Sequence, residues 1–385
     1  AQDLEPYLMD FASYDVVSKY YSYAVEYYKD TDNEIQWLPI CALPQTIIAN
    51  KTLFDQYGIK VPENYEEYVQ VCQQFYDKGI KPYSMNFAED WANQEIIQAA
   101  AIGEFTSLDG IDWRNEAETS AGEIKFDDVL WKRIFSETSQ FLKDSHFSKE
   151  DINVNINTGT QMFVEGKSAM FHGQPRDMQK FQDQMDAELI RIPYFSQTSD
   201  SSFVYMFPSL NIAFNKELEK NQEKLDTALD VLDCMISEQG QKLIADGSGV
   251  ISFNTDVPSM MQNVPGLEEE IKDTSIYIRY SAQKSFDASL EAVHGLLSGK
   301  MDEMQAYNVF RSAMNSKDSK EKSTVNFENE YSILLTDTTK SILKKINPKC
   351  AVEQIGDTTL SSAWIAAMSN GQQPSAPEDY IEVEK

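Results

Sequence analysis

The stretch Thr158–Lys180 places strong limits on the fold, because it ends one helix, crosses a short apolar strand and opens another helix. Phe163 lies on the last apolar turn of the first helix. Gly166 is typical of the left-handed residue that ends a helix. Ser168–Phe171 has the length and apolar character of a buried strand, and His172–Gly173 is expected to form a turn. This succession is typical of an α/β protein.

The residue that opens the second helix of this stretch is predicted to be Pro175. The first position of a helix accepts proline because its N–H would have no partner there. In open α/β sheets, the loop between a strand's carboxyl end and the next helix is where ligands bind. The stretch therefore predicts the edge of a binding site, although an ordinary strand–helix turn has the same spacing.

Two further segments have a similar order of elements. Leu43–Tyr83 predicts an apolar strand around Ile47 and Ile48, and then a short helix that Gly58 ends. A longer helix follows, with Asn64 as N-cap and Glu67 three residues later. Ser209–Val257 predicts a strand followed by two helices, the first with an apolar stripe from Leu225 to Ile236 and the second over residues 237–246.

Taken together and in this order, these segments resemble the extracellular solute-binding proteins of ABC importers, in particular the maltose-binding-protein-like group that captures oligosaccharides. The resemblance covers roughly residues 1–317. It is carried by four stretches, namely Asn50–Tyr68, Phe163–Gly173, Leu210–Val257 and Leu296–Tyr307. None of them is a catalytic signature, and their common order is what makes the resemblance specific.

The resemblance implies a two-lobed α/β fold of the periplasmic-binding-protein type, in which the chain crosses between lobes at hinge strands. The crossings are expected near residues 46–51, 210–215 and 252–258. Lobe one would then comprise residues 1–48 and 213–255, and lobe two residues 49–209 and 256–317. Family members carry a further block of strands before the point where this sequence begins, so lobe one is expected to lack its usual N-terminal strands or to be built differently.

The segment 318–385 does not follow the family pattern. A charged stretch, Ser316–Lys322, precedes it, and Gly371–Glu378 has the composition of a linker. We expect a C-terminal extension of unknown fold.

Charge and hydropathy narrow the classes of partner. The chain has 62 acidic and 33 basic residues and a formal charge of −29, so its field repels phosphate backbones and anionic membranes, and nucleic acid is not an expected partner. There is no apolar run of about eighteen residues that could span a bilayer. Neither a signal peptide nor a lipobox cysteine is visible at Ala1, which fits a mature or trimmed chain as well as a cytoplasmic one.

The four cysteines, Cys41, Cys72, Cys234 and Cys350, are too few and too scattered for a disulfide framework or a zinc site. We expect buried thiols, no metal and no cofactor. Together with the resemblance, composition favours an exported monomer that is periplasmic or a cell-surface lipoprotein, with membrane contact limited to a lipid anchor. The expected partners are an oligosaccharide and the permease subunits of an ABC importer.

A sugar site needs a flat apolar surface for the C–H face of the ring and polar side chains that pair with hydroxyl groups. The segment Asn86–Gln94 concentrates both kinds of group before an apolar helix. Trp91 is expected to stack on a sugar, and the family resemblance places an aromatic ligand contact at this junction. The expected hydrogen-bonding residues are Asn86, Glu89, Asp90 and Asn93. The alternative is that Trp91 packs on the sheet and the acids cap the helix.

Other candidate ligand contacts follow from the resemblance. Phe286 lies where the family commonly has a stacking aromatic, ahead of the helix that runs to Gly299, although a core phenylalanine is the alternative. Gly173 matches the family's turn, but Pro175 replaces the usual aromatic residue, so Gln174 and Arg176 are expected to hydrogen-bond instead. The variable stretch 193–207 adds weaker candidates, which are Tyr194, Phe195 and Tyr205.

Two other classes of function were weighed. Glu89 and Asp90 are adjacent on one loop and cannot straddle a glycosidic bond as the paired carboxylates of glycosidases do. The three histidines lack metal-ligand spacing, and no nucleophile elbow or nucleotide-binding motif occurs. An enzyme is therefore not expected. A sugar sensor or adhesion module on the same fold remains an alternative because of the C-terminal extension.

Overall fold

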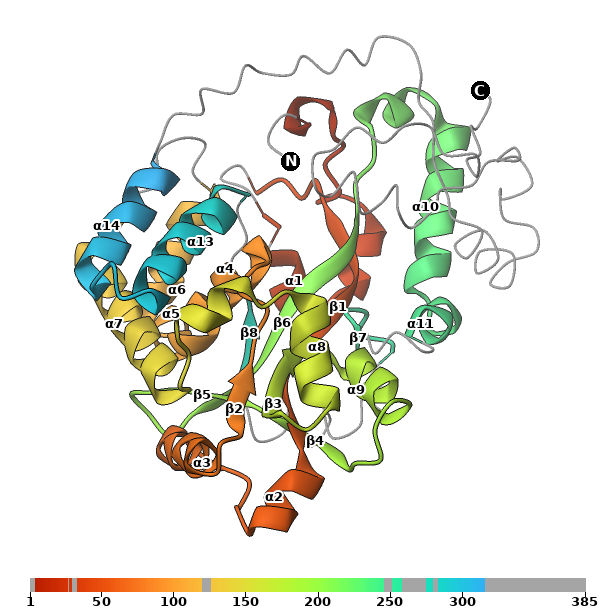
Figure 1. The fold of residues 1–385 in the computed structure, drawn as a ribbon. Coiled ribbons are helices and arrows are strands. Elements are labelled where there is room, and N and C mark those ends of the chain that lie inside the picture. The colour runs from red at the N-terminus through yellow and green to blue at the C-terminus, as the bar shows by residue number, and fades with distance from the viewer. Residues whose placement is uncertain are drawn as a thin grey trace, which may run out of the picture.

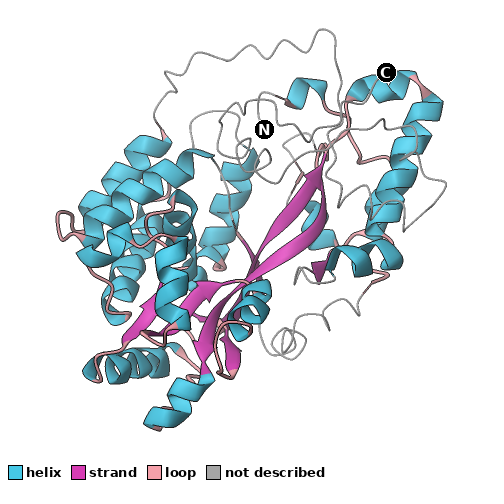
Figure 2. Ribbon diagram, turned by 45° about the vertical axis from the view of Figure 1, so that its right-hand side comes forward, coloured by secondary structure: helices cyan, strands magenta, loops and turns pink. Residues whose placement is uncertain are grey.

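The computed structural model describes residues 4–26, 28–29, 33–119, 126–245, 251–257, 275–279 and 283–315. Within them, helices cover a long, twisted sheet that runs obliquely through the molecule (Figures 1 and 2). The predicted C-terminal extension, 318–385, lies outside the described residues.

Eight strands form the sheet: β1 (Leu38–Asn50), β2 (Lys81–Ser84), β3 (Ser168–Gly173), β4 (Leu189–Ile192), β5 (Tyr194–Phe195), β6 (Ser202–Ile212), β7 (Ile251–Ser252) and β8 (Ser275–Ile278). The strand order is β2-β3-β1-β6-β5, with β4 and β7 pairing with β1 and β8 pairing with β6. The β2–β3 and β6–β8 pairs are parallel and the others antiparallel.

Strand β1 is the axis of the sheet, and all thirteen of its residues are buried. Its first part pairs with β6 as far as Gln45, which lies opposite Tyr205. From Thr46 onward it pairs with β3 and β4, and Thr46 lies opposite Gly173. The exchange of partners lies at the start of the stretch 46–51, where the sequence predicts a crossing between lobes, and that crossing stays a prediction. The lobe boundaries themselves stay predictions.

The helices are α1 (Ser22–Glu26), α2 (Lys51–Tyr57), α3 (Tyr65–Asp77), α4 (Asp90–Ala100), α5 (Ile102–Phe105), α6 (Leu108–Thr119), α7 (Asp128–Asp144), α8 (Ile156–Val164), α9 (Pro175–Gln182), α10 (Gln222–Ile236), α11 (Glu238–Ala245), α13 (Gln283–Leu297) and α14 (Glu303–Met314). Short 3-10 helices span Glu5–Tyr7, Asp15–Lys19, Lys149–Asn153 and Lys216–Lys220. In Figure 1, α4, α7, α13 and α14 gather on one side of the sheet and α10 and α11 on the other.

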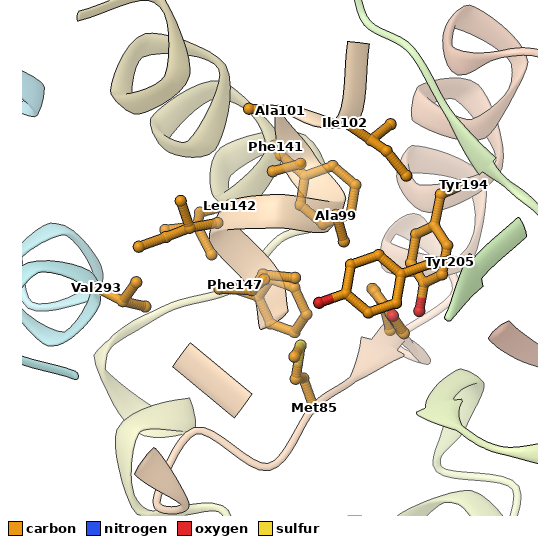
Figure 3. Packing of buried hydrophobic residues seen from close by; sticks show 14 of the residues in the cluster. Met85, Ala99, Ala101, Ile102, Phe141, Leu142, Phe147, Tyr194, Tyr205 and Val293 are labelled. Carbon is orange, nitrogen blue, oxygen red and sulfur yellow. The ribbon is translucent and has the colours of Figure 1, made fainter. Parts of the chain in front are cut away.

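Two apolar cores flank the sheet, and the alternation of side chains along β6 assigns residues to each. Phe203 and Tyr205 belong to a larger core that includes the apolar faces of α4, α7, α13 and α14. Val204 and Met206 point the other way, into a second core with α10 and the N-terminal segment. This is the two-residue period of a strand that is buried on both faces. Figure 3 shows part of the larger core.

The local helix signals are confirmed. Asn64 caps α3 by accepting a hydrogen bond from the backbone N–H of Glu67, at 2.9 Å. Gly58 and Gly166 both have left-handed backbones after their helices, and Pro175 opens α9. The turn expected at His172–Gly173 is wrong, because both residues continue β3 and pair with β1.

Among the cysteines, Cys41 and Cys72 are free and buried as expected. Cys234 is half-buried, so the expectation of a fully buried thiol is wrong there. Cys350 lies outside the described residues.

Candidate functional site

The connection from β2 to α4 carries the leading site residues, and its end faces solvent. Asp90 opens α4, is exposed, and accepts a hydrogen bond from the backbone N–H of Trp91 at 2.7 Å. Glu89 is half-buried, and its Oε1 atom accepts from the backbone N–H of Ile156 at 3.3 Å. Both carboxylates therefore lie at the N-terminus of the helix that carries Trp91.

Asn93 holds this connection in place from inside. Its Nδ2 atom donates to the carbonyl oxygens of Phe87 at 3.0 Å and Glu89 at 2.8 Å. The Nε2 atom of His294, on α13, lies 2.8 Å from the same Phe87 oxygen. Asn93 is completely buried, so the structure gives it the role of ordering the loop, in place of the ligand contact expected for it.

Asn86 is also buried, at 1% exposure. It packs beneath α8, where a side chain at Gly159 would bring its Cβ within 2.4 Å of the Asn86 Oδ1 atom. The close approach of α8 explains why glycine stands at position 159. The ligand contact expected of Asn86 stays a prediction.

Trp91 occupies the boundary between solvent and the larger core. Its ring is half-buried and packs against that core. The ring centroid lies 6.4 Å from that of His172, with an interplanar angle of 32°. One side of the indole ring therefore packs against the protein interior. Both interpretations of the sequence, a sugar platform and packing on the sheet, require this contact.

Beneath Trp91, a buried polar network crosses the core. The Nε2 atom of His172 lies 2.7 Å from Oε2 of Glu95, and the other Glu95 oxygen pairs with the Arg279 guanidinium. The Nδ1 atom of His172 lies 2.8 Å from the Tyr194 hydroxyl and 3.2 Å from the Tyr83 hydroxyl. The sequence pattern alone does not reveal this network.

The protonation states in the network follow from its geometry. Burial raises the pKa values of Tyr83 and Tyr194 far above their usual range, so both remain phenols. Because a carboxylate can only accept, Nε2 of His172 carries a hydrogen and donates to Glu95, whereas the phenol hydroxyls beside Nδ1 can either donate or accept. The Glu95 charge is balanced by Arg279, which makes a buried ion pair tolerable.

Arg279 extends this network to β6. Its guanidinium carbon lies 4.1 Å from the centroid of the Phe207 ring, and Phe207 packs against a small cluster formed by Cys41, Leu43 and Val257. Arg279 thus connects α4 to the part of the sheet where β1 and β6 pair.

Tyr205, a weaker candidate, is completely buried in the larger core. Its ring centroid lies 5.7 Å from that of Tyr194 and 5.5 Å from that of Tyr277. Figure 3 shows Tyr194 and Tyr205 among the core residues. Phe195 is buried as well. These three rings contribute to packing in this structure, so the ligand contacts expected for them are not available here.

Phe286 lies within the first turns of α13, although the sequence placed it ahead of that helix. It is half-buried. The preceding residue, Ser285, accepts a hydrogen bond from Nε2 of Gln94 on α4 at 2.9 Å. The structure therefore places Phe286 beside the helix that carries Trp91.

The loop after β3 holds the remaining candidates. Gly173 is buried at the end of β3, and a Cβ atom there would lie 2.9 Å from Ile48 Cδ1. Gln174 is half-buried, and its backbone N–H donates to Oδ2 of Asp177 at 2.9 Å. The side chain of Arg176 lies outside the described residues.

Within the described ranges, no group of three or more His, Cys, Asp or Glu side chains has the geometry of a metal site. None of the helices there is long and apolar enough to cross a membrane.

Residues 1–273 match the family of bacterial extracellular solute-binding proteins. This chain belongs to that family. It is a solute-binding protein, and the family is an extracellular one of binding proteins that are not enzymes.

The comparison with individual proteins agrees with this assignment. A family 1 extracellular solute-binding protein from Bifidobacterium longum subsp. infantis has a similar structure, with a TM-score of 0.66, 14% identity and coverage of 81% of each chain. A sugar transporter from Bacillus licheniformis in complex with stachyose superposes with a TM-score of 0.59, 14% identity and 80% coverage of each chain. These likenesses establish the mixed α/β fold of the family.

A curated relative, the multiple sugar-binding protein of Streptococcus mutans serotype c, is 24% identical over 148 residues, or 38% of this chain. The matched stretch spans 34% of the length of that relative.

Proposed function

We propose that this solute-binding protein binds an oligosaccharide beside the N-terminus of α4 and delivers it to an ABC-type permease. The observation that carries the proposal is the half-buried Trp91 ring, which the core supports on one side, at a helix N-terminus where Glu89 and Asp90 come directly before it in the chain. The family assignment supports a binding role.

The chemistry of this corner suits a sugar. The face of an indole accepts the C–H surface of a pyranose ring, and carboxylates accept hydrogen bonds from hydroxyl groups. Phe286 on the neighbouring helix α13 supplies a second ring, and Gln174 is the polar residue that we retain from the β3–α9 loop. The similar Bacillus licheniformis structure contains stachyose, and the curated relative is a multiple sugar-binding protein. A carbohydrate ligand is the simplest common explanation.

We further propose that the ligand lies in a cleft between two lobes and that the lobes close on it. The partner exchange of β1 between Gln45 and Thr46 supports a hinge at this position. A ligand that contacts both lobes favours the closed state by the difference between its affinities for the two states.

A thermal-shift screen tests the proposed ligand class. The panel contains stachyose, raffinose, maltose and chitin oligosaccharides, with free amino acids and a short peptide as other solute classes. A ligand at a hundred times its dissociation constant should stabilise the fold by about 2.7 kcal/mol. A shift with an amino acid or the peptide, and none with any sugar, would reject the carbohydrate proposal while leaving the binding role intact.

A further inference from the structure

His172 lies on β3, and the two-residue period of that strand decides which way its side chain points. Met170, two positions earlier, belongs to the larger core, whereas the intervening Phe171 belongs to a separate cluster. The His172 side chain therefore points with Met170 toward the larger core, and it is buried there. Its backbone is held at the same time by pairing with Ile47 of β1.

Inside the larger core, His172 meets one side of α4. Trp91 and Glu95 are four residues apart on that helix, so their side chains lie on the same side of it. The Nε2 atom of His172 lies 2.7 Å from Glu95 Oε2, and its ring centroid lies 6.4 Å from that of Trp91. The second distance is within the range of interacting aromatic pairs. One imidazole thus spans the first turn of α4.

Both nitrogen atoms of the His172 ring have partners, which fixes the orientation of the ring. Nε2 donates to Glu95, and Nδ1 lies within hydrogen-bond distance of the Tyr194 and Tyr83 hydroxyls, at 2.8 and 3.2 Å. These partners come from α4, β5 and β2. The N-cap of α4, Glu89, makes no side-chain capping hydrogen bond. The first turn of α4 therefore depends on tertiary contacts such as this one.

We propose that His172 is a positioning residue, which fixes the orientation of the Trp91 ring and thereby sets the affinity for the sugar. The effect on affinity rests on the proposed function, because it requires Trp91 to be the sugar platform. The effect on the ring does not, since it concerns only the two side chains. A platform that is already ordered binds more tightly, because less side-chain entropy is lost on binding.

Fluorine NMR of protein labelled with 5-fluorotryptophan tests the positioning of the ring without a sugar. The chain has five tryptophans, and single Trp→Phe variants assign their signals. His172→Gln keeps an N–H donor for Glu95 but lacks the ring. In this variant the Trp91 signal should shift or broaden. The signals of Trp113 and Trp131, which pack against each other on α6 and α7, should stay in place.

Tyr194→Phe and Tyr68→Phe form a matched pair, because each removes one buried hydroxyl. The first loses the 2.8 Å contact with His172 and the second a 2.7 Å hydrogen bond with Ser145. Both should lower the unfolding midpoint, but only Tyr194→Phe should shift the Trp91 signal, by less than His172→Gln does. If His172→Gln folds, an unchanged Trp91 signal in it overturns the proposal. If it does not fold, an unchanged signal in Tyr194→Phe does so.

Calorimetric titration of folded His172→Gln tests the effect on affinity. The probe is the sugar that gives the largest thermal shift among stachyose, raffinose, maltose and the chitin oligosaccharides. Its dissociation constant should rise about 2- to 12-fold, the equivalent of one aromatic pair. An unchanged dissociation constant would overturn this part of the proposal.

The Trp91→Ala variant tells the two failures apart. If it weakens binding of the same sugar while His172→Gln does not, the platform stands and only the role of His172 in affinity is rejected. If it leaves binding unchanged, the proposed sugar site itself is rejected.

Discussion

Oε2 of Glu95 lies 2.7 Å from Nε2 of His172, and both side chains are at most 2% exposed. The second Glu95 oxygen pairs with Arg279. Glu95 is thus the acceptor for an imidazole N–H and for a guanidinium at the same time. This places one compensated pair of charges directly beneath the half-buried Trp91 ring.

Removing one partner of the buried ion pair should destabilise the fold strongly. Replacing both partners together should destabilise it much less. Glu95→Gln removes the anion and leaves the Arg279 cation poorly compensated, at a cost of about 3–5 kcal/mol in the free energy of unfolding. The double variant Glu95→Gln/Arg279→Met removes both charges and should recover much of that loss. Urea titrations of the wild type, both single variants and the double variant give the coupling energy. Additive losses would contradict a compensated pair.

A second buried carboxyl predicts alkaline sensitivity. Burial and the neighbouring Glu104 carboxylate raise the pKa of Glu137 to about 8, although Arg133 opposes the shift. Because the folded pKa exceeds the unfolded one, the native state binds more protons between these values, and stability falls as pH rises through this window. The contribution of Glu137 to stability is fully present below about pH 4.5 and is lost as pH rises through 8, on the order of 5 kcal/mol at roughly 1.4 kcal/mol per pKa unit.

Denaturant unfolding at pH 5, 7 and 9 measures this effect. Glu137→Gln should flatten the pH dependence between pH 5 and 9, since its amide does not titrate. Glu291→Gln, at an exposed position on α13, is the control and should keep the wild-type slope. An unchanged slope in Glu137→Gln would assign the alkaline loss to another group.

Packing under the α8 helix predicts an intolerant glycine. A Cβ atom at position 159 would lie 2.4 Å from Asn86 Oδ1 and 3.3 Å from Ser84 Oγ, both buried. Gly159→Ala should therefore displace Asn86 or α8 and cost about 1–3 kcal/mol. At Gly295 the nearest atom is the flexible Met301 thioether, also at 2.4 Å, so Gly295→Ala is the control and should cost less. Equal losses in thermal unfolding would argue against a rigid contact at Asn86.

Local chemistry explains what the sequence could predict of the fold. Asn64 and Gly58 affect backbone groups within one helical turn of their own positions, so the sequence shows where these helices begin and end. Strand β1 was predicted only around Ile47 and Ile48, because Pro39 and Pro44 weaken the signal for a strand. Its full length follows from pairing with β6, which lies far along the chain.

The candidate site likewise has features that the sequence predicts and features that depend on long-range contacts. Trp91 lies at the start of a helix beside two acids, as the composition of the loop indicates. Asn93 is of a residue type that often binds sugars, yet its side-chain amide donates to the backbone carbonyl oxygens of Phe87 and Glu89. The Glu95 network joins residues 77 and 184 positions apart. Such long-range contacts leave no periodic signal, although a glutamate inside the apolar face of α4 is an indication of a buried partner.

The Trp91→Ala variant distinguishes between two roles for this residue, a platform for the ligand and a residue of the core. Loss of roughly 80–100 Å² of apolar contact with a sugar is worth about 2–2.5 kcal/mol, or about a 30- to 70-fold increase in the dissociation constant. A core role would instead cost about 3–5 kcal/mol of stability, with little change in affinity for the folded fraction. Tyr76→Ala, an exposed aromatic on α3, is the control; it should leave affinity unchanged and lower stability only by the loss of its stack on His146. An unchanged affinity together with a much lower melting temperature would remove Trp91 from the proposed site. Phe286 would then be the strongest aromatic candidate.

Calorimetric titration with the best sugar of the thermal-shift panel, followed by chromatography of the recovered sugar, tests whether the protein binds a sugar without altering it. We expect a roughly micromolar dissociation constant, about −8 kcal/mol, and a sugar recovered unchanged after prolonged incubation. The absence of heat for every sugar of the panel, or a shortened product, would contradict it.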